Sequence, residues 1–194
     1  MLTLYMSPGS SSMAPHIAMH EIGVPFEARW ISFGKQEQRT PEYLALNPEG
    51  KVPALIVGGR ALTEVAAVLY YLARSFPAAD LWPAGNIDAE AQIISWMSFI
   101  AATVHPARRA GRERSVEVFE IADKRLGDRD WAVGSSYSIA DIHLFRLNWR
   151  FVGSFGPHPD AFSNLTRHYD RMMARPAVQR TLQAESAVGY ELPA

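Results

Sequence analysis

The chain has 194 residues, of which 48% are hydrophobic, and its 19 basic and 20 acidic side chains give a net charge of −1. Its length allows one large domain or two small ones with a sizeable core, and its charge balance argues against a general affinity for nucleic acids or membrane surfaces. It contains no cysteine, which excludes disulfides, thiolate zinc sites, cysteine nucleophiles and iron–sulfur ligation by this chain.

The first part of the chain alternates between strand and helix patterns. Residues 2–6 form a short apolar run, which predicts a strand, and residues 26–31 predict a second strand. Between them, apolar residues recur at helical spacing over 13–22, and the serines before this stretch and Gly23 after it are typical helix boundaries. Because a helix connects the two strands, we expect them to run parallel.

A hairpin is predicted further along the chain. Residues 54–57 and 60–62 flank Gly58 and Gly59, a dipeptide suited to the left-handed backbone angles of a tight turn. The strands of this pair should therefore be antiparallel, which completes a mixed four-stranded sheet with the element order of a thioredoxin-like domain. The helices expected on either side of the hairpin cover residues 41–46 and 65–74.

The strand pattern stops after this region, and the domain boundaries follow from that change. We expect a thioredoxin-like α/β domain over residues 1–76, a Pro- and Gly-rich linker over 77–87 and an all-α domain over 88–194. The helices expected in the second domain cover residues 88–104, 115–126, 138–151, 165–174 and 178–184.

The clearest local motif of the second domain begins at Tyr137. Ser138 can cap a helix while Asp141, three residues on, reaches back as in a capping box. Tyr137 and Ile142 stand where a hydrophobic staple would be. A buried helix that needs a well-defined start explains this motif, so we interpret it as structural and not as catalytic.

The turn after the first strand is a candidate ligand site. Pro8 and Gly9 are followed by Ser10, Ser11 and Ser12 at the start of a helix. Free amides and the helix dipole make this position favourable for an anion, including a thiolate. A serine hydroxyl there either caps the helix or donates a hydrogen bond to a bound ligand, and the residues alone leave both readings open.

Two other short segments carry weaker signals. Glu64 and Val65 stand where a helix begins directly after a strand, and a carboxylate beside free amides suits the amine and carboxylate of an amino-acid group. Pro53 enters a strand, which fits either a cis peptide bond or an edge strand. Neither segment identifies a site without the other.

Together these segments resemble the glutathione transferase family, and specifically its bacterial beta class. Residues 8–18, PGSSSMAPHIA, are similar to that class's opening P-G-A-C-S-L-A-P-H-I, and residues 47–55, NPEGKVPAL, are similar to its N-P-x-G-x-V-P-A-L. Residues 62–66, LTEVA, resemble its L-T-E-[SV]-x helix start, and residues 138–141 resemble the S-x-x-D capping motif of its helical domain. The resemblance covers nearly the whole chain.

The resemblance implies that the first domain binds glutathione. Val52, held by a cis-Pro53, would pair its backbone with the cysteinyl part of glutathione like an added strand. Glu64 and the Val65 amide would hold the γ-glutamyl end. The residues implied to meet the glycine carboxylate are Lys35 and, nearby, Lys51.

The chain departs from the beta-class pattern beside the glutathione sulfur. The beta class has a cysteine where this chain has Ser11, and a serine forms no mixed disulfide with glutathione. A serine hydroxyl can donate a hydrogen bond to a thiolate and favour ionisation of the thiol, so we expect Ser11 to activate glutathione. Ser10 and Tyr5 are the second and third candidates for that role.

From the helical domain, the resemblance implies that His105 approaches the thiol. Taken alone, a single histidine before a proline is more typical of packing or of a helix end. The pocket for the electrophile is implied around Phe99, Ala102 and Arg109, beside His105.

Two further features are not expected to be functional sites. His16 and His20 share a helix face, but no third metal ligand is evident, so we expect no metal site. The arginines that follow His105 are interrupted by glutamates, which is typical of a solvated helix end or a pocket rim and not of a nucleic-acid site. These arginines are Arg108, Arg109, Arg112 and Arg114.

The function implied is that of a glutathione transferase, which activates its co-substrate glutathione for attack on small hydrophobic electrophiles, as in detoxification. The protein would contribute thiolate stabilisation and positioning. The alternatives are non-catalytic binding of glutathione or an apolar ligand, and a glutathione-dependent isomerase, peroxidase or ether-cleaving activity. The lack of cysteine disfavours disulfide exchange, and the family implies a homodimer.

We expect a cytoplasmic protein without a membrane partner. The N-terminus lacks a basic segment and reaches Pro8 and Gly9 too soon for a signal peptide. No apolar run approaches the roughly 20 residues that span a bilayer.

Overall fold

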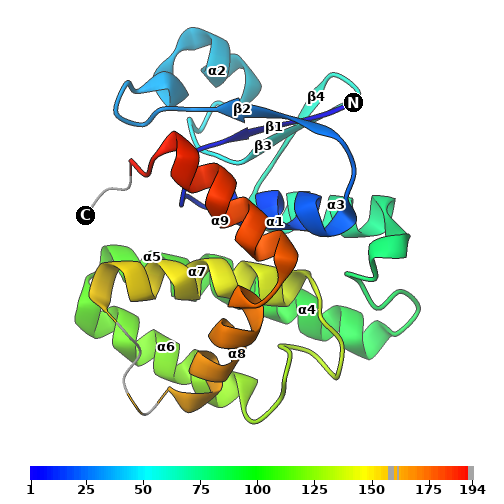
Figure 1. The fold of residues 1–194 in the computed structure, drawn as a ribbon, viewed down its shortest axis with the longest axis vertical. Helices are drawn as coiled ribbons and strands as arrows, with labels where there is room; N and C mark the ends of the chain where they lie inside the picture. Colours follow the sequence, from blue (N-terminus) through cyan, green and yellow to red (C-terminus); the bar gives the residue numbers. More distant parts are fainter. Residues whose placement is uncertain (157–159, 161, 192–194) are drawn as a thin grey trace. The chain divides into compact units, whose positions relative to one another are not determined.

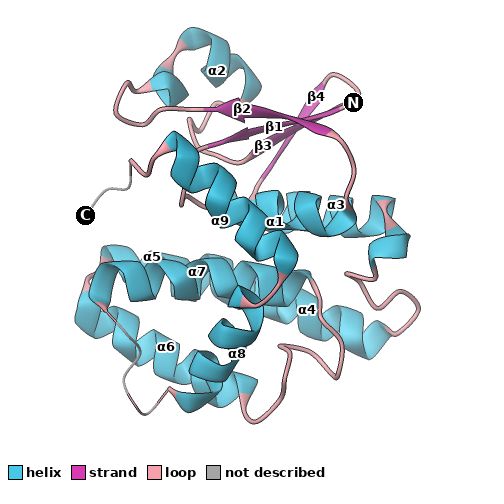
Figure 2. Cartoon of the chain, in the orientation of Figure 1, coloured by secondary structure: helices cyan, strands magenta, loops and turns pink. Residues whose placement is uncertain are grey.

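The computed structural model describes residues 1–156, 160 and 162–191. The chain forms two compact units, one made of Met1–Ala79 and Pro176–Ala194 and the other of Asp80–Arg175. The first unit contains the sheet, and the second is helical (Figures 1 and 2).

The sheet of the first unit has four strands in the order β2-β1-β3-β4. β1 (Leu2–Met6) pairs in parallel with β2 (Phe26–Trp30) and antiparallel with β3 (Ala54–Val57), which in turn pairs antiparallel with β4 (Arg60–Thr63). The predicted mixed sheet of the thioredoxin-like type is therefore confirmed. β1 is central, and its Leu4 lies opposite Ala28 on β2 and Leu55 on β3.

Helices cover both faces of this sheet, with α1 (Met13–Ile22) and α3 (Val65–Ser75) on one face and α2 (Pro41–Leu46) on the other (Figure 1). α1 connects β1 to β2, as parallel pairing requires. It ends at Gly23, whose positive φ of 75° gives the left-handed conformation that glycine adopts easily. Short 3₁₀ turns at Glu37–Arg39 and Pro77–Ala79 complete the first part of this unit.

The last helix, α9 (Pro176–Val188), also belongs to the first unit, where it packs along α1 (Figure 1). α1 is therefore enclosed by α3 and α9, and its residues 13–19 are all buried. A helix that is buried all round needs apolar residues on every side. The sequence pattern predicts residues 178–184 to be part of the helical domain, whereas in the structure they belong to the first unit. The physical reason is that Glu185 and Thr181 on α9 form hydrogen bonds with the first part of the chain. Glu185 binds Gly9 and His16, and Thr181 binds His20.

The second unit consists of α4 (Ile87–Phe99), α5 (His105–Arg109), α6 (Arg112–Leu126), α7 (Ile139–Phe155) and α8 (Ser163–Met173). The sequence pattern predicted a single helix over residues 88–104, whereas a π-helical turn (Ile100–Val104) joins α4 to the short α5. In the part of the chain that the structure describes, no helix is long and apolar enough to cross a bilayer.

The predicted capping box at the start of α7 is confirmed. The Ser138 hydroxyl oxygen accepts a hydrogen bond from the Ala140 N–H, and Asp141 Oδ2 accepts from the Ser138 N–H at 2.9 Å. Asp141 Oδ1 also accepts from the Ala132 N–H at 2.7 Å and lies 3.1 Å from His168 Nε2. Asp141 is fully buried, so it holds a loop and two helices together, which is the structural role that we inferred.

Candidate functional site

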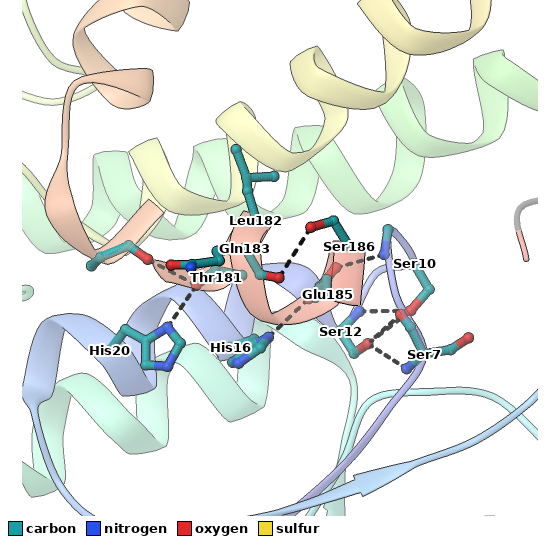
Figure 3. A network of polar contacts seen from close by, with 12 residues as sticks. Ser7, Ser10, Ser12, His16, His20, Thr181, Leu182, Gln183, Glu185 and Ser186 are labelled. Atoms are coloured by element: carbon teal, nitrogen blue, oxygen red, sulfur yellow. Dashed lines mark hydrogen bonds and ion pairs between the residues drawn. The ribbon is translucent and has the colours of Figure 1, made fainter. Parts of the chain in front are cut away.

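The turn between β1 and α1 is held by hydrogen bonds among its own serines (Figure 3). Ser12 Oγ accepts from the Ser7 N–H at 3.0 Å and donates to the Ser7 carbonyl at 3.2 Å. Ser10 Oγ lies 2.8 Å from Ser12 Oγ and accepts from the Ser12 N–H at 3.2 Å. Because the Ser12 proton goes to the Ser7 carbonyl, Ser10 must donate to Ser12. Both hydroxyl protons are used inside the turn.

Ser11 differs from the two serines beside it. Ser10 and Ser12 are buried, whereas Ser11 is partly exposed. The Ser11 hydroxyl makes no hydrogen bond to any residue between 1 and 191 that the structure describes. Of the three hydroxyls in this turn, Ser11 is the one whose proton is available to a ligand.

The turn is also anchored from the end of the chain, by a buried carboxylate on α9 (Figure 3). Glu185 Oε2 accepts from the Gly9 N–H at 2.6 Å, and Glu185 Oε1 lies 2.9 Å from His16 Nδ1. Both side chains are buried. An ionised carboxylate only accepts hydrogen bonds, so His16 donates through Nδ1. Glu185 thus ties the turn that carries Ser11 to α1 and α9.

A second contact of the same kind lies one turn along α1. His20 Nδ1 is 2.9 Å from Thr181 Oγ1, which donates its proton to the Ala177 carbonyl. His20 therefore donates through Nδ1. Burial, helped by the nearby His16 and Arg180, lowers the pKa of His20 to about 4. His16 and His20 both bind α9, and each has a partner other than a metal ion.

Tyr5 and Val52 lie together on one side of the sheet. They pack in a small cluster with Ile31, Tyr43 and Phe33. The ring of Tyr5 is tilted against that of Tyr43, with centroids 5.7 Å apart. Tyr43 is buried, and burial raises the pKa of its phenol to about 12. The structure therefore places the third thiol candidate, Tyr5, beside the residue implied to pair with the cysteinyl part of glutathione.

The segment before β3 presents free backbone groups. The Val52–Pro53 peptide bond is cis, as the resemblance implies. The preceding Lys51 carbonyl is held by the Tyr43 hydroxyl at 2.6 Å and by Asn47 Nδ2 at 2.7 Å. By contrast, the Val52 N–H and carbonyl have no hydrogen-bond partner within the described chain. Val52 is therefore free to pair with an added strand.

The start of α3 has an unusual backbone. Glu64 occupies the N-cap position with φ 68°, a left-handed value that is uncommon for a residue other than glycine. Such strain costs about 1–3 kcal/mol and concentrates at binding sites. The first amides of a helix, here from Val65 onward, have no partner inside the helix. An exposed carboxylate and free amides thus meet at one helix end.

The two predicted lysines are both exposed, but their surroundings differ. Lys51 Nζ pairs with Glu49 at 2.5 Å. Lys35 lies on a loop that already holds a carboxylate, because Glu191 accepts from the Gly34 N–H and the Ser32 hydroxyl, each at 2.9 Å. These bonds lower the pKa of Glu191. The loop beside Lys35 therefore holds one carboxylate, that of Glu191, through a backbone N–H and a hydroxyl.

The residues predicted in the helical domain all lie on the segment from α4 to α5. Phe99 ends α4, Ala102 lies in the π-helical turn, and His105 and Arg109 begin and end α5. The Phe99 ring packs against Trp96 at 6.0 Å, so it contributes to the interior of this unit. π-helical turns occur frequently at functional sites, because they change the direction in which the following side chains point.

Neither the contact of Glu185 with Gly9 nor the hydrogen bonds that Ser10 and Ser12 make within the turn are indicated by the sequence. Gly9 and Glu185 are separated by 176 positions, and no local pattern around either residue reports the contact. No group of three or more His, Cys, Asp or Glu side chains that could hold a metal ion is found among the described residues.

Comparison with known proteins identifies two family domains. Residues 1–74 match the model of the glutathione S-transferase N-terminal domain, and residues 87–176 match that of the C-terminal domain. Glutathione S-transferase GST-4.5 of Xanthomonas campestris is 31% identical, with 95% of this chain and 98% of that protein covered.

Two solved structures show the same similarity over nearly their full length. The bacterial beta class glutathione S-transferase of Sphingomonas chungbukensis is 33% identical with a TM-score of 0.84, covering 94% of this chain and 98% of that one. A sphingomonad glutathione S-transferase complexed with glutathione is also 33% identical, with a TM-score of 0.85 and coverage of 95% and 98%.

Proposed function

This chain belongs to the glutathione S-transferase family, and we propose that it binds glutathione on its first unit and activates the thiol for attack on small electrophiles. The observation that carries this proposal is the hydrogen bonding of the turn after β1. Of its three consecutive hydroxyls, the chain uses the protons of Ser10 and Ser12 and leaves that of Ser11 available.

Ser11 is the residue that we propose to activate the thiol. A hydroxyl that donates a hydrogen bond to a thiolate stabilises the charged form and lowers the pKa of the thiol. The amides at the start of α1 favour the same negative charge. In this role, Ser11 and not Ser10 stands in place of the beta-class cysteine, and the only thiol of the site is the one that glutathione brings.

The remaining contacts of glutathione follow from the free groups of the first unit. The Val52 N–H and carbonyl suit the backbone of the cysteinyl part, and Glu64 with the Val65 amide suits the γ-glutamyl amine and carboxylate. The loop of Lys35 suits the glycine carboxylate, since it binds the carboxylate of Glu191 in this structure. His105 would assist from the helical unit, beside an electrophile site around Phe99, Ala102 and Arg109.

The Ser11→Ala variant tests the proposed activation. A hydrogen bond to a charged group contributes about 1.5–3 kcal/mol, which corresponds to a rise of about one to two units in the pKa of bound glutathione. We expect this rise in a titration of the thiolate absorbance, together with a fall of at least tenfold in kcat/KM on an aryl halide near neutral pH.

Ser135→Ala is the matched control for that experiment. Ser135 is exposed in a loop of the second unit, and its variant should leave both measurements unchanged. If Ser11→Ala keeps the wild-type titration, the activating role passes to Ser10 or Tyr5. If glutathione bound to the wild type shows no thiolate near neutral pH, the proposed mechanism is wrong.

We also propose, as membership of the family implies, that the protein acts as a cytoplasmic homodimer. Large apolar side chains are exposed on helices of both units, among them Tyr70 and Ile94, and such residues suit a contact between subunits. Sedimentation equilibrium distinguishes the dimer from a monomer of 21.6 kDa.

A further inference from the structure

The segment that follows α9 turns back onto the first unit. Gly189 comes directly after the helix and has φ 98°, a left-handed value that glycine adopts easily. The hydroxyl of the next residue, Tyr190, donates to the Leu182 carbonyl of α9 at 3.4 Å. Glu191 then contacts the loop after β2, at Gly34, which lies 157 positions earlier in the chain. All these residues belong to the first unit.

The loop after β2 holds the Glu191 carboxylate with two donors. The Gly34 N–H donates to Oε2 at 2.9 Å, and the Ser32 hydroxyl donates to the carboxylate with both oxygens at 2.9 Å. The bond from Gly34, then that from Ser32, and the positive charge of Lys35 lower the pKa of Glu191. Glu191 is therefore ionised near neutral pH and binds the loop as an anion.

The loop keeps its shape through hydrogen bonds that do not involve Glu191. Ser32 Oγ accepts from the Lys35 N–H at 3.1 Å, and the Ser32 N–H donates to Glu37 Oε2 at 2.8 Å. The Glu37 N–H donates in return to the Ser32 carbonyl at 3.0 Å. The Ser32 hydroxyl and the Gly34 N–H have one proton each. A second carboxylate can therefore use these two donors only when Glu191 has left them.

The charges around the loop also favour a single additional carboxylate. Lys35 is exposed, and its ammonium group forms no ion pair with a carboxylate of the described chain. Glu37 and Glu191 already bring two negative charges to the loop that contains this lysine. A third carboxylate at the same loop would be repelled by both, and the departure of Glu191 removes part of that repulsion.

We propose that Glu191 occupies the position of the glycine carboxylate of glutathione, so that the segment after α9 competes with the co-substrate and leaves the loop when glutathione binds. This inference rests on the proposed function, which assigns the glycine end of glutathione to the loop of Lys35. The contact is exposed, and exposed charged contacts are weak enough for a ligand to displace. The competition lowers the apparent affinity for glutathione, because only the fraction of the protein with a vacant loop binds it fully.

The Glu191→Ala variant removes the competing carboxylate. Titration calorimetry should show that it binds glutathione about two- to fivefold more tightly than the wild type, the range for an exposed charged contact. Glu120→Ala is the matched control, because it removes an exposed carboxylate of the same charge from α6, and its binding should equal that of the wild type. Unchanged or weaker binding in Glu191→Ala overturns the proposal. Equal tightening in both variants assigns the effect to net charge and overturns it too.

An ester of glutathione locates the competition at the glycine end. In the glycine monoethyl ester, the carboxylate that would bind the loop is uncharged, so the ester has no anion with which to replace Glu191. The ester should therefore bind equally to the wild type and to Glu191→Ala, while glutathione binds more tightly to the variant. An equal gain for glutathione and its ester would mean that Glu191 obstructs the site in general, which overturns the competition for the glycine position.

The amide signal of Gly34 in the nuclear magnetic resonance spectrum reports the contact directly, since this N–H donates to Glu191. In isotope-labelled protein without ligand, the signal should differ between the wild type and Glu191→Ala. Saturating glutathione should bring both signals to one position, because the same carboxylate then occupies the loop in both proteins. A difference that persists at saturation means that Glu191 stays on the loop, and it overturns the proposal.

N-Acetylglycine separates this proposal from the proposed function. If neither the wild type nor Glu191→Ala binds glutathione, the proposed function fails. N-Acetylglycine carries the glycine carboxylate alone, so it still tests the loop. It should move the Gly34 amide signal of Glu191→Ala at a lower concentration than that of the wild type. Equal concentrations for the two proteins overturn the competition at the loop.

Discussion

At the scale of single residues, the protein depends on buried carboxylates that serve several donors at once. Glu185 accepts from the Gly9 N–H and from His16, and it is fully buried. A buried carboxylate is stable only when its oxygens are hydrogen-bonded. One of its partners, Gly9, lies on the turn that carries Ser11, and the other, His16, lies on α1, so a change at Glu185 is expected to act on the proposed site through the position of the turn.

Glu185→Ala is expected to destabilise the fold. The shortened side chain accepts no hydrogen bond, so the buried Gly9 N–H loses its acceptor and His16 Nδ1 loses its partner. A buried donor without an acceptor costs about 1–3 kcal/mol, and urea denaturation should show a loss of at least that size. In Glu120→Ala, an exposed pair with Lys124 is lost, and the change should stay below about 1 kcal/mol. Equal losses in both variants would contradict this role of Glu185.

At the scale of elements, the start of α7 and the junction of α4 with α5 show what local sequence can report. Ser138 and Asp141 are three residues apart, and their reciprocal hydrogen bonds form within one turn, so the pattern identified them. The π-helical turn (Ile100–Val104) carries ordinary apolar residues. The helical spacing of apolar residues before the turn continues into it without a visible break, so the sequence pattern does not mark it.

Asp141→Ala is expected to be among the most damaging substitutions in the second unit. It removes the acceptor of the Ser138 and Ala132 N–H groups and the partner of His168. With about 1–3 kcal/mol for each buried donor left alone, the free energy of unfolding should fall by at least about 3 kcal/mol. Asp130→Asn is the control, because Asp130 is exposed and binds Arg171 at the surface. A loss below about 1 kcal/mol in Asp141→Ala would show that the cap is dispensable.

At the scale of the whole molecule, each unit contains a histidine whose pKa is lowered by burial, His20 to about 4 and His143 to about 3. Unfolded, these side chains return to a pKa of 6.5. The unfolded state then binds more protons as the pH falls below that value, so stability decreases. Above pH 6.5, we expect these two histidines to leave the free energy of unfolding unchanged. As the pH falls from 6.5 toward 4, they should make the free energy of unfolding smaller.

The His20→Gln variant measures the share of the first unit in that pH dependence. Urea denaturation at a series of pH values should give a shallower fall than in the wild type, since one of the two groups is gone. A curve of unchanged slope would mean that His20 is already protonated in the folded protein, against the direction that its burial dictates.

The sheet, most helices and the Ser11 turn could be predicted because each depends on neighbours along the chain. The Gly58–Gly59 hairpin and the β1–α1–β2 crossover are examples, and both are present. The contact between Gly9 and Glu185 could not be predicted, since 176 positions separate the two residues. The burial of Arg146 and Arg150 could not be predicted either. Arginine side chains are usually exposed, and the neighbouring residues of α7 do not mark these two positions as buried.

The division of the first unit between the two ends of the chain affects the order in which the protein can fold during synthesis. Translation proceeds from the N-terminus, and domains generally fold as units while the chain emerges. The second unit, Asp80–Arg175, is continuous and is complete before any residue of α9 has been made. Gly9 and His16 are made well before their buried partner, Glu185, which follows them by 176 and 169 positions. On the ribosome, the turn that carries Ser11 is therefore anchored only after both the second unit and α9 have been made.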